Sequence, residues 1–146
     1  MKKLFLFIFV TVLYLSCETK VVATDIPKIN GYWEIEKVVF PDGSEKEYSI
    51  NEVYDYFEIN NNKGIRKKVM PQLDGTFLVN DTFETIQIIQ LEGKYTIHFS
   101  TAFAKWREEI VLLDAKKLVL LNPSKNEYHY KRTAAINIIP HGKKTQ

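Results

Sequence analysis

The chain has 146 residues, with 20 Lys or Arg against 18 Asp or Glu, and a single cysteine. Lys2 and Lys3 lie in an N-terminal segment that we expect to be removed, which leaves 18 basic and 18 acidic residues in the mature chain. This balance argues against a nucleic-acid partner held by charge, and one cysteine excludes a disulfide-stapled scaffold.

The first sixteen residues have the form of a secretory signal peptide. Two lysines follow Met1, and an apolar run from Leu4 to Leu15 follows them. The run is too short to cross a bilayer comfortably as a helix, and segments of this kind are cut from the mature protein. We therefore exclude residues 1–16 from the fold.

The only cysteine, Cys17, directly follows Ser16 in the stretch LYLSCETK. This stretch resembles a bacterial lipoprotein signal, in which the cysteine thiol is lipidated and the peptide bond before it is cut. The resemblance implies fatty acyl chains such as palmitate on Cys17, and Glu18 in the next position implies the outer membrane. More than one chain makes such an anchor stable. The alternative is a secretory signal cut nearby, which leaves Cys17 discarded or as a free thiol.

The segment after the cysteine carries no strand or helix periodicity. We expect residues 17–28 to form a lipidated, flexible tether between the membrane and the folded domain. Fully extended, residues 18–28 would hold the domain roughly 35 Å from the membrane surface.

Residues 29–133 read as one domain of short strands. Apolar residues recur mostly at every second position, and turn residues separate the segments. Examples are VYDYFEI, which alternates through Asp55, Phe57 and Ile59, and KYTIHFS, which alternates through Tyr95, Ile97 and Phe99. Residues 134–146 follow the last strand pattern and are expected to form a C-terminal tail that frays toward its end.

The strand pattern predicts an all-β fold. Roughly eight to ten consecutive antiparallel strands must hide their edges, and closure into a barrel is the usual solution for hairpins in sequence. We therefore predict an antiparallel up-and-down β-barrel. A β-sandwich is the alternative, because periodicity alone does not separate the two.

The first strand begins Gly31-Tyr32-Trp33, and Arg132 ends the last strand about a hundred residues later. This combination resembles the lipocalins, and in particular the short lipocalin-like domains of bacterial envelope lipoproteins. The resemblance implies that the arginine covers the tryptophan at the narrow end of the barrel, as a structural closing pair. A guanidinium can stack on an indole and donate to backbone carbonyls. Strand parity predicts that Trp33 shares the interior face with Val39, and that Arg132 shares it with Tyr128 and Tyr130.

No catalytic constellation stands out, and we predict neither an enzyme nor a cofactor. His98 has no Cys, Asp or second His at a ligand spacing, so we interpret it as an exposed strand histidine. Glu108 and Glu109 fall on opposite faces of one strand, which is wrong for an acid–base pair within that segment. The basic run IRKK, residues 65–68, is interpreted as a solvated strand rather than as an anionic-ligand patch.

Aromatic residues are the enriched class, and four of them are candidates to line a ligand pocket: Tyr95, Phe99, Tyr128 and Tyr130. Side chains can equally fill a small eight-stranded barrel, and we favour the filled core. Two hypotheses follow. One is a binding module for a small apolar or amphipathic ligand, anchored to the bacterial envelope. The other is a structural or protein-interaction subunit with a filled barrel, which docks another envelope protein through FPDGSEKEY or TAFAKW.

Overall fold

The computed structural model describes residues 20–134. The predicted signal peptide, the lipidation site at Cys17 and the C-terminal tail beyond Ala134 lie outside the described residues. Among residues 20–134, no helix is both long and apolar enough to cross a membrane.

The described chain consists of one short 3₁₀ helix followed by strands. The helix, η1, spans Ala23–Ile29. The strands are β1 (Gly31–Val39), β2 (Glu45–Glu47), β3 (Tyr54–Asn60), β4 (Lys63–Pro71), β5 (Phe77–Val79), β6 (Glu84–Leu91), β7 (Lys94–Ser100), β8 (Lys105–Leu113), β9 (Lys117–Leu121) and β10 (Glu127–Thr133).

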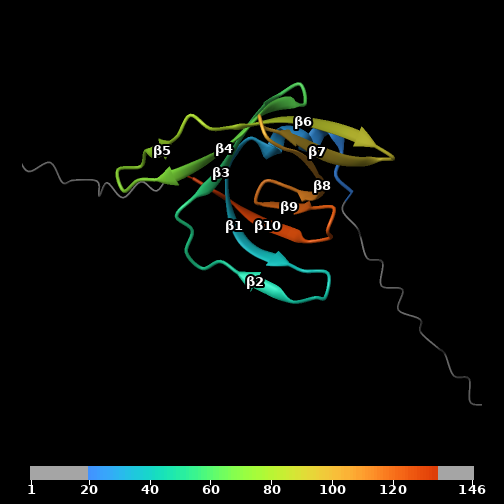
Figure 1. The fold of residues 1–146 in the computed structure, drawn as a ribbon, viewed down its shortest axis with the longest axis horizontal. Coiled ribbons are helices and arrows are strands. Elements are labelled where there is room, and N and C mark those ends of the chain that lie inside the picture. Colours follow the sequence, from blue (N-terminus) through green and yellow to red (C-terminus); the bar gives the residue numbers. More distant parts are fainter. Residues whose placement is uncertain (1–19, 135–146) are drawn as a thin grey trace, which may run out of the picture.

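Eight strands form a closed antiparallel ring, in the order β1, β3, β4, β6, β7, β8, β9 and β10 (Figure 1). The pairing of β10 with β1 closes it and sets Trp33 opposite Arg132. The two remaining strands lie off the ring, since β2 pairs with β1 and β5 with the end of β4. The prediction of an up-and-down barrel is confirmed, and the β-sandwich alternative is wrong because a sandwich has no such closing pair.

Tight turns with left-handed backbone join neighbouring strands. Asn61 and Asn62, between β3 and β4, have φ of 49° and 63°. Positive φ at both central residues suits the right-handed twist of a two-residue hairpin, and asparagine tolerates it. The turn between β6 and β7 uses Glu92 and Gly93 in the same way, with φ of 52° and 76°.

A β-bulge in β1 changes which side chains face the interior. The register of β1 against β10 shifts between Ile35 and Lys37. The extra residue moves the alternation by one position. Val38 is therefore buried, whereas Val39, which the parity argument placed inside with Trp33, is only half-buried. The uninterrupted alternation that we predicted for this strand is wrong beyond Ile35.

The two ends of the barrel follow from the strand directions. We call the end that contains η1 and the turns at 61–62, 92–93 and 114–116 the closed end. The end that contains the loops at 40–53, 72–83, 101–104 and 122–126 is the open end. Because β10 runs toward the closed end, the described chain both begins and finishes there.

The segment before β1 seals the closed end and is not a free tether. Val21, Ile26 and Ile29 are buried in the main core cluster, and η1 packs against β3 and β8. The structure thus differs from the expected extended linker, because these apolar side chains gain more from burial than from exposure. From Val21 onward, the residues assigned to the tether belong to the folded domain.

The barrel interior is filled by large side chains. Those that are almost fully buried come from η1 and from four strands of the ring: Ile29, Trp33, Phe57, Ile97, Phe99, Leu118 and Leu120. Ile86, Ile88, Ile110 and Tyr130 belong to the same cluster. Because side chains fill the middle of the barrel, a functional site is expected at one of its two ends.

Candidate ligand-binding site

The structure brings Trp33 and Arg132 together near the closed end. The guanidinium carbon Cζ of Arg132 lies 4.2 Å from the centroid of the Trp33 ring. Trp33 is fully buried, and its Nε1 donates a hydrogen bond of 2.7 Å to the carbonyl oxygen of Ile29. The last residue of η1 therefore provides the hydrogen-bond acceptor for the buried indole N–H.

Arg132 ties three segments of the closed end together. Its Nε donates to the carbonyl oxygen of Ala115 at 2.7 Å, and its Nη1 donates to that of Asn30 at 2.8 Å. Its Nη2 donates to the carbonyl oxygen of Lys28. The planar fork of arginine suits such divergent acceptors. Because all three acceptors are backbone carbonyls, we interpret the role of Arg132 as structural.

All four candidate lining residues reach the interior, but they do not line one pocket. Tyr95, the second residue of β7, lies toward the closed end, and Phe99 lies toward the open end of the same strand. Tyr130 is buried, and Tyr128, half-buried, packs against the core. Tyr95 and Tyr130 are thus core residues, whereas Phe99 and Tyr128 approach the open end.

A group of ionisable side chains occupies the barrel at the open end, and we call it the arginine cluster: Asp55, Arg66, Glu84 and Glu108. Arg66 is 8% exposed, and its Nε pairs with Glu84 Oε2 and lies 3.8 Å from Asp55 Oδ1. Lys68 Nζ approaches the same Asp55 oxygen to 2.6 Å, outside hydrogen-bond geometry. Buried charges are stable only when paired, so these contacts hold Arg66 in place.

Aromatic rings surround the guanidinium of Arg66. Its Cζ lies 4.2 Å from the centroid of Phe99, and the Phe99 ring stacks on Trp106 with centroids 5.1 Å apart and planes at 12°. Trp106 remains half-buried. Guanidinium, Phe99 and Trp106 therefore make a layered apolar and cationic surface at the open end.

Burial raises the pKa of the Glu108 carboxyl above its ordinary value. Arg66 acts in the opposite direction, and the neighbouring carboxylates of Asp55 and Glu84 add to the increase. For Arg66 itself, burial lowers the pKa, but the hydrogen bond to Glu84 and the charge of Asp55 outweigh it and the net shift is upward. The cluster thus holds three carboxyl groups around one guanidinium, and burial favours the protonated form of Glu108.

A cleft of about 150 Å³ opens onto this cluster. It is lined by Arg66, Lys68, Thr82, Phe83, Glu84 and Thr101. The cleft lies where β4 and β6 separate, because their pairing is limited to Lys63–Arg66 on β4. Pockets for whole drug-sized ligands usually measure about 300–1,000 Å³. The cleft therefore suits one end of a ligand rather than a whole one.

Two exposed aromatic side chains lie at the open end, and one of them, Phe83, lines the cleft. Phe103, in the loop between β7 and β8, is 99% exposed, and Phe83, just before β6, is 50% exposed. Apolar rings that remain in water next to a charged cluster provide contact area for a ligand with both apolar and polar parts.

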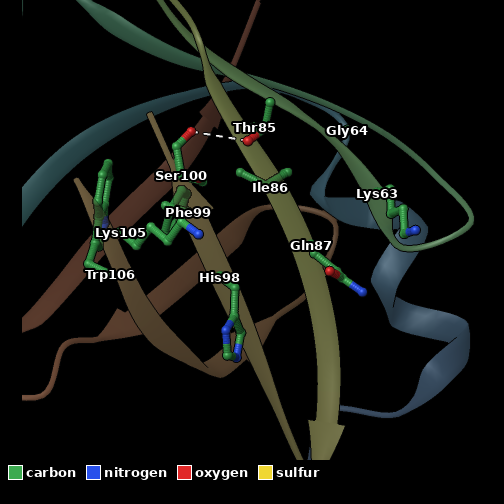
Figure 2. Close-up of a pocket in the computed structure, with 10 residues that line it drawn as sticks. All are labelled: Lys63, Gly64, Thr85, Ile86, Gln87, His98, Phe99, Ser100, Lys105 and Trp106. Carbon is green, nitrogen blue, oxygen red and sulfur yellow. Dashed lines mark hydrogen bonds between the residues drawn. The ribbon is translucent and has the colours of Figure 1, made fainter. Parts of the chain in front are cut away.

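A larger groove, of about 530 Å³, lies on the barrel wall across β4, β6, β7 and β8, and Phe99 and Trp106 are among its lining residues (Figure 2). His98 and Gln87 project from neighbouring strands there, and the Thr85 hydroxyl donates to the Ser100 carbonyl oxygen at 3.1 Å. His98 is half-buried on this wall. Within residues 20–134, no group of three or more His, Cys, Asp or Glu side chains is arranged to hold a metal ion. The groove carries no convergent set of catalytic groups.

The arginine cluster was missed by the sequence analysis, although the signal was present. Asp55 alternates with Phe57 and Ile59, which placed its carboxylate on the interior face. Arg66 pairs in register with Phe57, so it shares that face. The interpretation of IRKK as a solvated strand is wrong for Arg66, because Asp55 on β3 and Glu84 on β6, the strands on either side of β4, provide carboxylate partners for its charge.

The Lipocalin-like domain family model matches residues 29–120. No curated protein matches the chain. Among solved structures, a lipocalin-like protein from Bacteroides uniformis is 12% identical, with 73% of this chain and 99% of that chain covered and a TM-score of 0.47. A protein of Bacteroides eggerthii described as uncharacterized is 12% identical, with 71% and 98% covered and a TM-score of 0.45. Apocrustacyanin C1 is 11% identical, with 76% and 64% covered and a TM-score of 0.46.

Proposed function

Because this chain belongs to the lipocalin-like domain family, whose fold generally binds small hydrophobic ligands, we propose that it is a non-catalytic binding module of the bacterial envelope. It is anchored through lipid on Cys17, in the outer membrane, and it binds a small amphipathic ligand at the open end of its barrel.

The observation that carries this proposal is the difference between the two ends. At the closed end, Arg132 and Trp33 direct their polar groups to backbone carbonyls, and η1 covers the core. At the open end, Arg66 lines the cleft and stacks on Phe99, which in turn stacks on Trp106, and the loops carry exposed phenylalanines. We infer that a ligand enters from this end.

The filled interior supports an amphipathic ligand held at the mouth. Trp106 and Phe103 supply apolar contact, and Arg66 and Lys68 supply charge-assisted donors. The Asp55, Glu84 and Glu108 carboxyl groups outnumber these two cations, so a polar or zwitterionic head group suits the site better than a polyanion.

Native mass spectrometry of the protein extracted from its own envelope tests this proposal. We expect a non-covalent small amphiphile bound to the wild-type protein, and we expect Trp106→Ala to lose it because half of the aromatic stack is removed. Val22→Ala, which shortens an exposed apolar side chain at the closed end, is the matched control and should retain the ligand. Wild-type protein without any bound amphiphile would contradict the proposal.

The anchor is tested separately. Radiolabelled palmitate should be incorporated into the wild-type chain and not into Cys17→Ala, and the labelled protein should fractionate with outer membranes. A wild-type chain that takes up no label would remove the anchor from the proposal without affecting ligand binding.

A second candidate function is a structural or interaction subunit, and the 99% exposure of Phe103 favours it. A single exposed phenylalanine above a filled barrel can anchor a protein partner. A photo-crosslinking residue at position 103 would then trap one envelope protein in intact cells, whereas the same residue in place of Leu91 at the closed end would not. Equal yields at both positions would argue against this function.

A further inference from the structure

The closed end carries a charge pattern that the neutral composition of the chain hides. Segments 20–28, 61–63, 92–94 and 114–117 contain six lysines against three carboxylates: Lys20, Lys28, Lys63, Lys94, Lys116 and Lys117 against Asp25, Glu92 and Asp114. All six lysines are exposed. Two of them also make ion pairs, Lys28 with Asp25 and Lys94 with Glu109.

The loops of the open end carry the opposite charge. Counted in the same way, with the first residue of the strand that follows each loop, they contain eight carboxylates against three lysines: Asp42, Glu45, Glu47, Glu52, Asp74, Asp81, Glu84 and Glu127 against Lys46, Lys105 and Lys125. The barrel is therefore polar along its axis, with a basic closed end and an acidic open end. A charge separation of this kind orients a molecule at a charged surface.

Two apolar side chains stand among the lysines of the closed end. Val22 is 50% exposed and Leu91 is 64% exposed. They belong to the segment that leads into η1 and to the end of β6 respectively. Lysines with a few apolar residues between them form the pattern that binds the interface of a bilayer with anionic head groups.

The distance to the expected anchor points to the same surface. Only Glu18 and Thr19 separate Cys17 from Lys20, where the described chain starts. Three residue steps span at most about 10 Å, far less than the roughly 35 Å of an eleven-residue tether. A lipid on Cys17 therefore brings the closed end of the barrel within reach of the head groups.

We propose that the closed end is a membrane-docking surface, on which the lysines at its rim contact anionic lipid head groups while Val22 and Leu91 lie at the bilayer interface. This inference rests on the lipidation in the proposed function. It fixes the orientation of the barrel: the open end points away from the bilayer, and a ligand enters from the aqueous side instead of directly from the anchoring membrane.

The two turns at either end of β9 give a matched test. Ala115→Cys places a unique thiol in the turn at the closed end, and Ser124→Cys places one at the open end. Lipidation blocks the native thiol of Cys17, so each thiol can carry a fluorophore. The labelled full-length lipoproteins are reconstituted into vesicles of phosphatidylcholine and phosphatidylglycerol that contain a head-group nitroxide lipid.

We expect several-fold stronger quenching of the label at position 115 than of that at position 124. The difference should decrease in vesicles without phosphatidylglycerol and in high salt, because both weaken the attraction. Lys20→Glu with Lys63→Glu should also decrease it, whereas Lys105→Glu with Lys125→Glu, at the open end, should leave it unchanged. Equal quenching of the two labels, or stronger quenching at position 124, would overturn the inference.

The intact mass of each sample separates this result from a failure of the proposed function. An intact mass that includes no acyl chains means that the lipid anchor is absent, and it overturns both the anchor and the membrane-docking surface. A lipidated protein with equally quenched labels leaves the anchor in place and overturns the orientation alone. Loss of ligand at the open end changes neither readout.

Discussion

The two ends of this barrel bury polar groups in opposite ways. At the closed end, Arg132 and Trp33 donate to neutral backbone carbonyls, and the Arg132 bonds fix β10 to the segment before β1 and to the turn before β9. At the open end, Arg66 is held by carboxylates that are themselves partly buried and that crowd one another. The Arg132–Trp33 arrangement therefore closes the barrel, whereas the arginine cluster remains sensitive to pH and to a ligand.

The largest expected effect lies at the closed end. Trp33→Ala should lower the free energy of unfolding by about 4 kcal/mol, because a fully buried indole is removed and a cavity remains. Urea unfolding followed by circular dichroism measures the change. Phe103→Ala is the control, since its side chain is in water and its loss should change stability by less than about 0.5 kcal/mol. Equal stability of the two variants would break the comparison.

The next effect lies at the open end. Arg66→Met should destabilise the protein by about 3 kcal/mol, because Asp55 and Glu84 are left without their guanidinium. The same urea titration applies. Adding Glu84→Gln to Arg66→Met should recover part of the loss, since one unpaired carboxylate is then removed. No recovery in the double variant would mean that packing on Phe99, and not charge, determines the role of Arg66.

A smaller loss is expected for Arg132→Lys, about 2 kcal/mol. Lysine keeps the charge but not the planar fork, so it cannot reach the carbonyls of Lys28, Asn30 and Ala115 together. Thermal unfolding measures the loss. Lys131→Arg, one residue earlier on the outer wall, is the matched control and should leave stability unchanged. An unaffected Arg132→Lys variant would show that stacking on Trp33 alone closes this end.

The smallest effect is a dependence on pH. Because the pKa of Glu108 is raised, ionising it opposes folding as the pH rises from the ordinary value of 4.5 through the raised pKa. Glu108→Gln should therefore be more stable than the wild type at neutral pH, and the difference should vanish below about pH 4.5. Glu109→Gln, which removes the neighbouring carboxylate on the outer wall, should not reproduce this profile. A constant difference at every pH would show that the pKa of Glu108 is not raised in the folded protein.

The barrel could be predicted from sequence because its signals are local. Alternation through Phe57 and Ile59 and turns such as Asn61-Asn62 specify consecutive hairpins, and the motif around Trp33 with a distant Arg132 suggested how the ring closes. Burial of Val38 could not be predicted, because the bulge depends on pairing with β10. The burial of Val21 and Ile26 could not be predicted either, because an irregular segment has no hydrophobic periodicity and its burial depends on the barrel that it covers.

The arginine cluster shows a different limit. Strand alternation placed Asp55 and Arg66 on the interior face. Their charge predicted exposure instead, and we gave the charge more weight because charged residues are rarely buried. Glu84 lies opposite Arg66 on β6 and Glu108 lies on β8, so these carboxyl groups are identified as neighbours only when the order of the strands is known. A charged residue on an apolar strand face is best interpreted as one member of an interior pair whose partner is still to be found.

The central claim is that ligand enters at the open end and that the closed end is sealed, and the two tryptophans of the chain test it directly. Trp33→Phe leaves Trp106 at the open end as the only tryptophan, and Trp106→Phe leaves Trp33 at the closed end. Both variants are titrated with an amphiphile that carries a brominated alkyl chain. We expect saturable quenching of Trp106 and none of Trp33, which is fully buried under Arg132. Quenching of Trp33 equal to or greater than that of Trp106 would contradict the claim.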